Sequence, residues 1–172
     1  MRKCERNNPI RMKRVAQLIC LMFILVGCGK SNHDQNDLMN GIRLTEINGN
    51  PLELTQYKGK VVFINFWATW CKPCIQEMPT LVKAQDKFKN DNIVFLYASN
   101  EESDQIEKFQ KKHSFDFHYV RVKNFEELNI QALPTTYIFN ADGKLEFSEA
   151  GFRNWDATEN IELITSIVNH EK

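Results

Sequence analysis

The sequence predicts an α/β domain with a mixed central sheet and helices on both of its faces. Two runs of β-branched and aromatic residues, Val61–Trp67 and Ile93–Ser99, lack polar alternation, which is typical of strands buried on both faces. Between them, apolar residues recur at helical spacing from about Lys72 to Asn90. This alternation of strand, helix and strand predicts parallel pairing through right-handed crossovers, with Val61–Trp67 as the central strand.

Shorter signals complete the domain. An Asn48-Gly49 turn between Ile42–Ile47 and Leu52–Leu54 indicates an N-terminal hairpin. A second antiparallel hairpin is expected where a turn-rich linker joins Thr135–Asn140 to Lys144–Ala150. The other expected elements are a helix capped by Ser103 that runs to about His113, an extended segment over Phe117–Val122, and a closing helix over Asn154–Val168.

The sequence Trp70-Cys71-Lys72-Pro73-Cys74 places a C-x-x-C motif between the first buried strand and the helix after it. A thiol at the start of a helix faces the positive end of the helix dipole, where it ionises more easily. We therefore expect Cys71 to be an exposed nucleophile. Cys74 lies one helical turn further on, better shielded, where it can displace a partner that Cys71 has captured. The motif indicates thiol-disulfide exchange.

The segment Phe66–Cys74, followed by Glu77-Met78-Pro79, resembles the active site of the TlpA/ResA-type branch of the thioredoxin superfamily. These proteins are membrane-tethered, extracytoplasmic thiol-disulfide oxidoreductases. The resemblance implies a thioredoxin fold with an additional N-terminal β-hairpin and a helix-bearing insertion after the second buried strand.

The same resemblance implies a surface that binds the substrate. Pro134 matches the position of the cis-proline that faces the C-x-x-C loop in this family. With that bond cis, the backbone of Leu133 would lie beside the disulfide and pair with an extended substrate strand. The residues implied to bind substrate are Trp70, Leu133, Pro134 and Thr135.

Glu77 has two interpretations. It lies one turn after Cys74 on the same helix face, and it is also an acidic residue in the first turns of a helix, which the helix dipole favours. In ResA-type proteins the matching glutamate is thought to tune the proton affinities of the two cysteines. Asn65 stands where thioredoxin usually has a buried aspartate, and asparagine does not ionise. Glu77 is therefore the available candidate for an internal proton acceptor.

The N-terminus is expected to direct the chain out of the cytoplasm. A basic segment precedes the apolar run Leu18–Val26, which is shorter than the roughly 20 residues that span a membrane. Residues 1–27 are therefore predicted to be a signal peptide. Leu25-Val26-Gly27-Cys28 resembles a lipoprotein cleavage site, with Cys28 lipidated, residues 28–40 as a flexible tether and residues 41–172 as the thioredoxin-like domain.

Charge and cysteine content agree with an extracytoplasmic redox protein. Residues 1–28 hold six of the 22 basic side chains and one of the 22 acidic ones, so the remainder carries 16 against 21, a net charge of −5. An acidic domain is a poor nucleic-acid binder, so nucleic acid is not expected as a partner. Cys4 and Cys20 would be removed with the signal peptide and Cys28 would be lipidated. Only Cys71 and Cys74 then remain as free thiols, in a compartment where disulfides persist.

By resemblance, we expect a bacterial cell-envelope protein that faces the periplasm and reduces protein disulfides, with apocytochrome c as one candidate substrate. A membrane thiol-disulfide reductant would reset the cysteine pair. No metal and no cofactor are expected, because a zinc site needs more ligands than one C-x-x-C supplies. Two alternatives remain: a peroxiredoxin-like thiol peroxidase, and a copper- or haem-handling binding module that uses the cysteines with a histidine such as His118.

Overall fold

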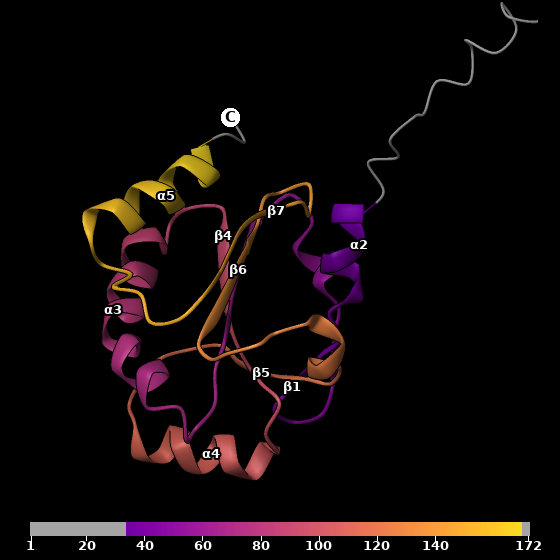
Figure 1. The fold of residues 1–172 in the computed structure, drawn as a ribbon, viewed down its shortest axis with the longest axis vertical. Helices are drawn as coiled ribbons and strands as arrows, with labels where there is room; N and C mark the ends of the chain where they lie inside the picture. The colour runs from indigo at the N-terminus through magenta and orange to yellow at the C-terminus, as the bar shows by residue number, and fades with distance from the viewer. Residues whose placement is uncertain (1–33, 170–172) are drawn as a thin grey trace, which may run out of the picture. The chain divides into compact units, whose positions relative to one another are not determined.

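A computed structural model describes residues 34–169 of the chain (Figure 1). The predicted signal peptide and Cys28 lie outside the described residues. The helices are α2 (Asp34–Gly41), α3 (Lys72–Phe88), α4 (Ser103–Lys112) and α5 (Thr158–Asn169), with 3-10 helices η2 (Leu54–Tyr57) and η3 (Phe125–Leu128). The strands are β1 (Leu44–Glu46), β2 (Pro51–Leu52), β3 (Val61–Phe66), β4 (Ile93–Ser99), β5 (Tyr119–Val122), β6 (Thr135–Phe139) and β7 (Leu145–Ala150).

The strands form one mixed sheet in the order β2-β1-β5-β4-β3-β6-β7. β3 pairs in parallel with β4, and β4 in parallel with β5, whereas the terminal hairpins add antiparallel pairs. The predicted mixed α/β fold is confirmed. The middle position belongs to β4 rather than to β3, because the N-terminal hairpin adds two strands beyond β5.

Alternate side chains of β3 supply two separate cores. Phe63 packs with α3, α4 and α5, whereas Val62 and Ile64 pack with residues of α2, η2 and η3 on the opposite face. Figure 1 shows α3 and α5 together on one side of the strands and α2 on the other. Successive right-handed crossovers from β3 to β4 to β5 move in one direction, so they place α3 and α4 on the same face.

Three strand ends meet in register at one edge of the sheet. Thr135, the first residue of β6, pairs with Phe66, the last residue of β3, and with Ala150, the last residue of β7. The segments that continue beyond these ends are the loop to Cys71, the turn at Pro134 and the loop that begins at Gly151. The sheet therefore brings three separate parts of the sequence to one place.

Several boundaries differ from the sequence predictions. The segment predicted as a tether contains α2, in which Met39 is buried and packs in the core beside η2. Helix α4 is capped by Glu102 through a capping box with Gln105, and the Ser103 hydroxyl instead donates to the Ile47 carbonyl oxygen at 2.7 Å. Helix α5 begins four residues later than expected because residues 154–157 form a turn, closed by a bond from the Ala157 N–H to the Asn154 carbonyl.

Among residues 34–169, none of the helices is both long enough and apolar enough to cross a bilayer.

Phe63 provides a test of the core that packs between the sheet and helices α3, α4 and α5. Its ring is fully buried, with its centroid 4.8 Å from those of Phe95 and Trp155. We expect Phe63→Ala to lower the free energy of unfolding by about 3–5 kcal/mol in urea denaturation, because a large cavity replaces the ring. Phe152→Ala, at a half-exposed position, should cost less than about 0.5 kcal/mol. Equal losses would contradict this assignment of the core.

Candidate active site

Cys71 and Cys74 form a disulfide at the start of α3, with their Cα atoms 5.3 Å apart. Cys71 is the N-cap of the helix, and the Cys74 N–H points at its Sγ at 3.3 Å. Pro73 fits the first turn of the helix, where no backbone N–H is needed. In the reduced form the same N–H and the helix dipole favour a thiolate on Cys71 over one on Cys74.

The expectation of an exposed Cys71 is wrong for this oxidised form. Cys71 is 3% exposed and Cys74 1% exposed, so burial alone does not distinguish them. Both belong to the apolar cluster that contains Trp67 and Ala68, and Leu133 packs against it. Nucleophile and resolving cysteine therefore differ in their position at the helix end rather than in exposure.

The Leu133–Pro134 peptide bond is cis, and it immediately precedes β6. The Thr135 hydroxyl donates to the Ala132 carbonyl at 2.7 Å, which closes the turn around this bond. The Pro134 carbonyl accepts from the Gly151 N–H, also at 2.7 Å. The turn is thus fixed on the edge of the sheet that carries the disulfide.

Glu77 is a buried carboxylate, 1% exposed, within α3. Its Oε1 accepts from the Asn65 side-chain amide at 2.7 Å, and its Oε2 accepts from the Arg153 N–H at 3.1 Å. Burial raises the pKa of Glu77 to about 7, although the bonds from Arg153 and Asn65 and the Trp155 indole oppose that rise. Nε1 of Trp155 is buried and makes no hydrogen bond, so the two bonds from Asn65 and Arg153 are the ones that hold the carboxylate. Glu77 therefore changes protonation state near neutral pH.

Asn65 links Glu77 to the strand beside the cis-proline. Its amide nitrogen also donates to Thr136 Oγ1 at 3.0 Å, whereas its Oδ1 is buried without a hydrogen-bond partner. An asparagine here supplies a donor to Glu77 and no charge of its own. The ionisable group of this hydrogen-bonded pair is therefore Glu77 on α3, and the residue on β3 carries no charge.

A second buried carboxylate, Glu101, holds the loop before the cysteines. Its two oxygens accept from the Thr69 N–H and the Thr69 hydroxyl, both at 2.6 Å, and the Ser99 hydroxyl donates to it at 3.1 Å. The sequence analysis missed Glu101, because nothing in the spacing of residues 69 and 101 indicates that they meet.

The loop after β7 was also missed. Arg153 donates its N–H to Glu77, while its side chain pairs with Glu149 and Asn160 and lies over the Phe147 ring, 5.0 Å from the centroid. Trp155 is anchored to α3, since its N–H donates to the Thr80 hydroxyl at 3.0 Å. The helix predicted from residue 154 included Trp155, which the structure places in this loop.

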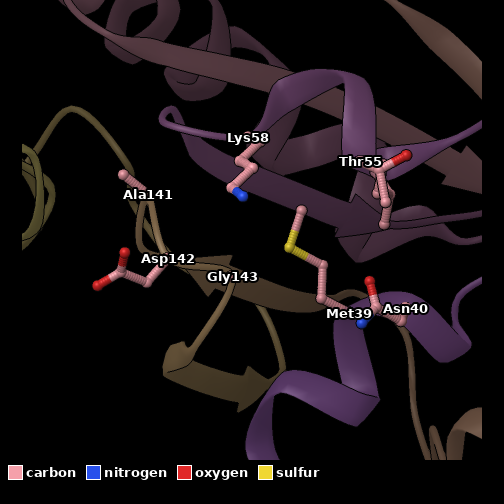
Figure 2. Close-up of a pocket in the computed structure, with 8 residues that line it drawn as sticks. Met39, Asn40, Thr55, Lys58, Ala141, Asp142 and Gly143 are labelled. Atoms are coloured by element: carbon pink, nitrogen blue, oxygen red, sulfur yellow. The ribbon is translucent and has the colours of Figure 1, made fainter.

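Two hollows lie away from the disulfide. One, of about 230 Å³, lies beside the turn that follows β6, where Figure 2 shows the Met39 sulfur extending toward the segment with Gly143. That turn follows Phe139, which pairs with Val62 at the end of β3 opposite to the cysteines. The other lies beside His118, whose Nε2 pairs with Glu46 at 3.0 Å. Within the described part of the chain, no three His, Cys, Asp or Glu side chains are grouped as metal ligands.

Comparison with known proteins agrees with the geometry. Residues 36–148 match the AhpC/TSA family. The chain is 30% identical over 151 residues to the thiol-disulfide oxidoreductase ResA of Bacillus subtilis, covering 83% of this chain and 84% of that protein. It is 34% identical to ResA of Bacillus cereus over 106 residues, which span 59% of this chain and 61% of the relative.

Solved structures share the fold. The thioredoxin domain of a thiol-disulfide oxidoreductase from Bacteroides vulgatus matches with a TM-score of 0.64 at 21% identity, covering 74% of this chain and 93% of that one. An exposed lipoprotein thioredoxin from Streptococcus pneumoniae matches with a TM-score of 0.58 at 22% identity, covering 70% and 97%. At these identities the likeness shows a thioredoxin fold.

The burial of Glu77 predicts a pH dependence of stability. A folded pKa near 7, against an ordinary value of 4.5, means that the folded protein retains a proton that the unfolded chain has lost. The protonated carboxyl group gives its full contribution to stability below pH 4.5. The free energy of unfolding should therefore decline by about 3 kcal/mol as the pH rises to 7 and above. We expect urea denaturation of the oxidised protein to show this decline, and Glu77→Gln to remove it. Glu107→Gln, at an exposed site, serves as the control, and an unchanged slope in Glu77→Gln would contradict the assignment.

Proposed function

This chain belongs to the AhpC/TSA family, and from that premise we propose that it is an extracytoplasmic thiol-disulfide oxidoreductase that works through Cys71 and Cys74. The observation that carries the proposal is the Cys71–Cys74 disulfide at the N-terminus of α3, on the sheet edge that also holds the cis Leu133–Pro134 bond. The similarity to ResA over most of both chains supports the same activity.

The exchange begins with the reduced pair. The Cys71 thiolate attacks one sulfur of a substrate disulfide, and the other substrate sulfur leaves as a thiolate that takes a proton from solvent. Cys74 then loses its proton and attacks Cys71 Sγ, which forms the Cys71–Cys74 disulfide and releases the second substrate sulfur as a thiolate that takes a proton from solvent. Two electrons pass from the enzyme to the substrate, which acquires two thiols.

We assign Glu77 to the proton of the second step. A carboxylate with a pKa near 7 is matched to accept a proton at neutral pH, and it lies one helical turn after Cys74. The donors from Asn65 and Arg153 fix its two oxygens in place. The substrate chain lies across Trp70, Leu133, Pro134 and Thr135, next to the disulfide.

Peroxidase activity is not favoured. A peroxiredoxin-type site needs a proline and a threonine upstream of its cysteine, and Phe66–Cys71 lacks that proline and spacing. The similarity is instead to relatives named thiol-disulfide oxidoreductases. A peroxide turnover assay separates the two activities.

The proposed location is the outer side of a bacterial membrane, with Cys28 lipidated after removal of residues 1–27. The similarity to an exposed lipoprotein thioredoxin supports this proposal, as does the Leu25–Cys28 motif. The proposed direction is reductive, with protein disulfides as substrates, apocytochrome c among them, and a membrane thiol-disulfide reductant that restores the dithiol.

The order of attack is testable by trapping. Cys74→Ser should accumulate covalent mixed disulfides with partner proteins on non-reducing gels, because Cys71 still attacks and nothing releases it. Cys71→Ser should accumulate none. Equal trapping by the two variants, or trapping by Cys71→Ser alone, would contradict the assigned roles.

Lipidation is tested by Cys28→Ser. This variant should lose its lipid and shift from the membrane fraction to the soluble fraction, while the purified protein keeps its disulfide exchange rate. Fractionation with mass spectrometry of the N-terminus provides the measurement. An unlipidated variant that stays with membranes would count against Cys28 as the anchor.

A further inference from the structure

The side chain of Arg153 joins β7, α5 and the loop between them. Its guanidinium pairs with Glu149 Oε2 on β7 at 3.0 Å and also donates to Asn160 Oδ1 on α5. It lies over two aromatic rings, 5.0 Å from the centroid of Phe147 and 5.8 Å from that of Trp155. A planar guanidinium with two acceptors and two rings around it is held in one orientation.

The backbone of the same residue contacts Glu77. The Arg153 N–H donates to Glu77 Oε2 at 3.1 Å, while Oε1 accepts from the Asn65 side chain at 2.7 Å. Of the effects that oppose the rise in the pKa of Glu77, the bond from the Arg153 backbone is the largest. Because the guanidinium and this N–H belong to one residue, the contacts that fix the side chain also restrict the direction of the N–H.

The loop is attached independently on either side of Arg153. The Gly151 N–H donates to the Pro134 carbonyl at 2.7 Å, and the Trp155 N–H donates to the Thr80 hydroxyl at 3.0 Å. The two residues next to Arg153 have exposed side chains, which do not hold the backbone between them. Removal of the Arg153 side chain should therefore leave both ends of the loop in place and release only its centre.

We propose that Arg153 is a positioning residue for the exchange reaction: its side chain holds its own backbone N–H against Glu77 and so keeps that carboxylate free to take the proton of Cys74. This inference rests on the proposed function. A carboxylate that loses a hydrogen-bond donor binds its own proton more tightly, so less of it is available as a proton acceptor at neutral pH. Arginine suits the position because it bonds to several acceptors in one plane and stacks on rings, whereas a lysine ammonium is a point charge.

Two kinds of titratable group lie near Glu77. Tyr97 on β4 interacts with it electrostatically, and burial holds the pKa of Tyr97 well above its ordinary value, so this phenol stays protonated near neutral pH. Cys71 and Cys74 precede Glu77 at the start of the same helix, and they do not titrate while they form a disulfide. In the oxidised protein, a titration near neutral pH at the Glu77 carboxyl group therefore belongs to Glu77 itself.

The first test follows the Glu77 carboxyl carbon by isotope-edited NMR of the oxidised protein. We expect a midpoint near 7 in the wild type and about one pH unit higher in Arg153→Ala. Asn160→Ala, which leaves the charge of Arg153 in place, should shift the midpoint in the same direction, and the double variant should add little. Arg43→Ala, which removes an exposed arginine paired with Glu127, is the control and should change nothing.

The second test uses the reduced protein and dithiobis(nitrobenzoate). This disulfide releases one coloured thiolate when Cys71 attacks it and a second when Cys74 attacks Cys71. A midpoint one unit higher lowers the deprotonated fraction of Glu77 at pH 7 from about a half to about a tenth. We therefore expect Arg153→Ala to slow the second release about fivefold at pH 7 and less than twofold at pH 9, and to change the first release less than twofold.

A midpoint in Arg153→Ala that is unchanged or lower overturns the inference. Equal slowing of both releases at every pH also overturns it, because that indicates a disturbed site. A shift in Arg153→Ala without one in Asn160→Ala assigns the effect to the lost positive charge and likewise overturns it. If the wild-type protein releases no second thiolate, the proposed exchange through Cys74 fails, while the NMR midpoints still decide whether Arg153 positions Glu77.

Discussion

The site depends on the register at the first residue of β6. Thr135 pairs with Phe66 on one side and with Ala150 on the other, so the chain leaving β3, the turn entering β6 and the chain leaving β7 meet at one level. The chain leaving β3 leads to Cys71, and the turn entering β6 contains the cis Leu133–Pro134 bond. The chain leaving β7 provides the Arg153 N–H that donates to Glu77. A slip of one residue in this pairing would turn every side chain of β6 to the other face of the sheet.

The sequence predicted those parts whose signal is local. The buried run of β3, the helix after it and the C-x-x-C between them are continuous in the chain, so strand, helix and nucleophile position follow from residues 61–88 alone. The N-terminal hairpin is predicted by Asn48-Gly49 in the same way. In the structure Gly49 has φ of 89°, the positive value that such a turn requires. Pro134 needed family resemblance, because most X-Pro bonds are trans and nothing in the neighbouring residues indicates a cis bond.

The parts that the sequence did not predict depend on contacts between distant residues. Glu101 meets Thr69 only because parallel pairing places the end of β4 beside the end of β3. The burial of Cys71 likewise comes from surrounding residues of the core, not from its place at a helix start. Helical periodicity predicted α5 too early because Trp155, which fits the apolar stripe, is instead held in a loop by its bond to Thr80.

Two buried carboxylates in one small site need separate explanations. Burying a charge is costly unless hydrogen bonds compensate, and Glu101 accepts three of them, from Thr69 and Ser99. Glu77 accepts two, and burial raises its pKa to about 7 in spite of them. Glu101 holds the loop before the cysteines, and Glu77 lies on the helix that follows them. Burial, which the donors to Glu77 only partly offset, therefore makes that carboxylate the candidate proton acceptor of the proposed exchange.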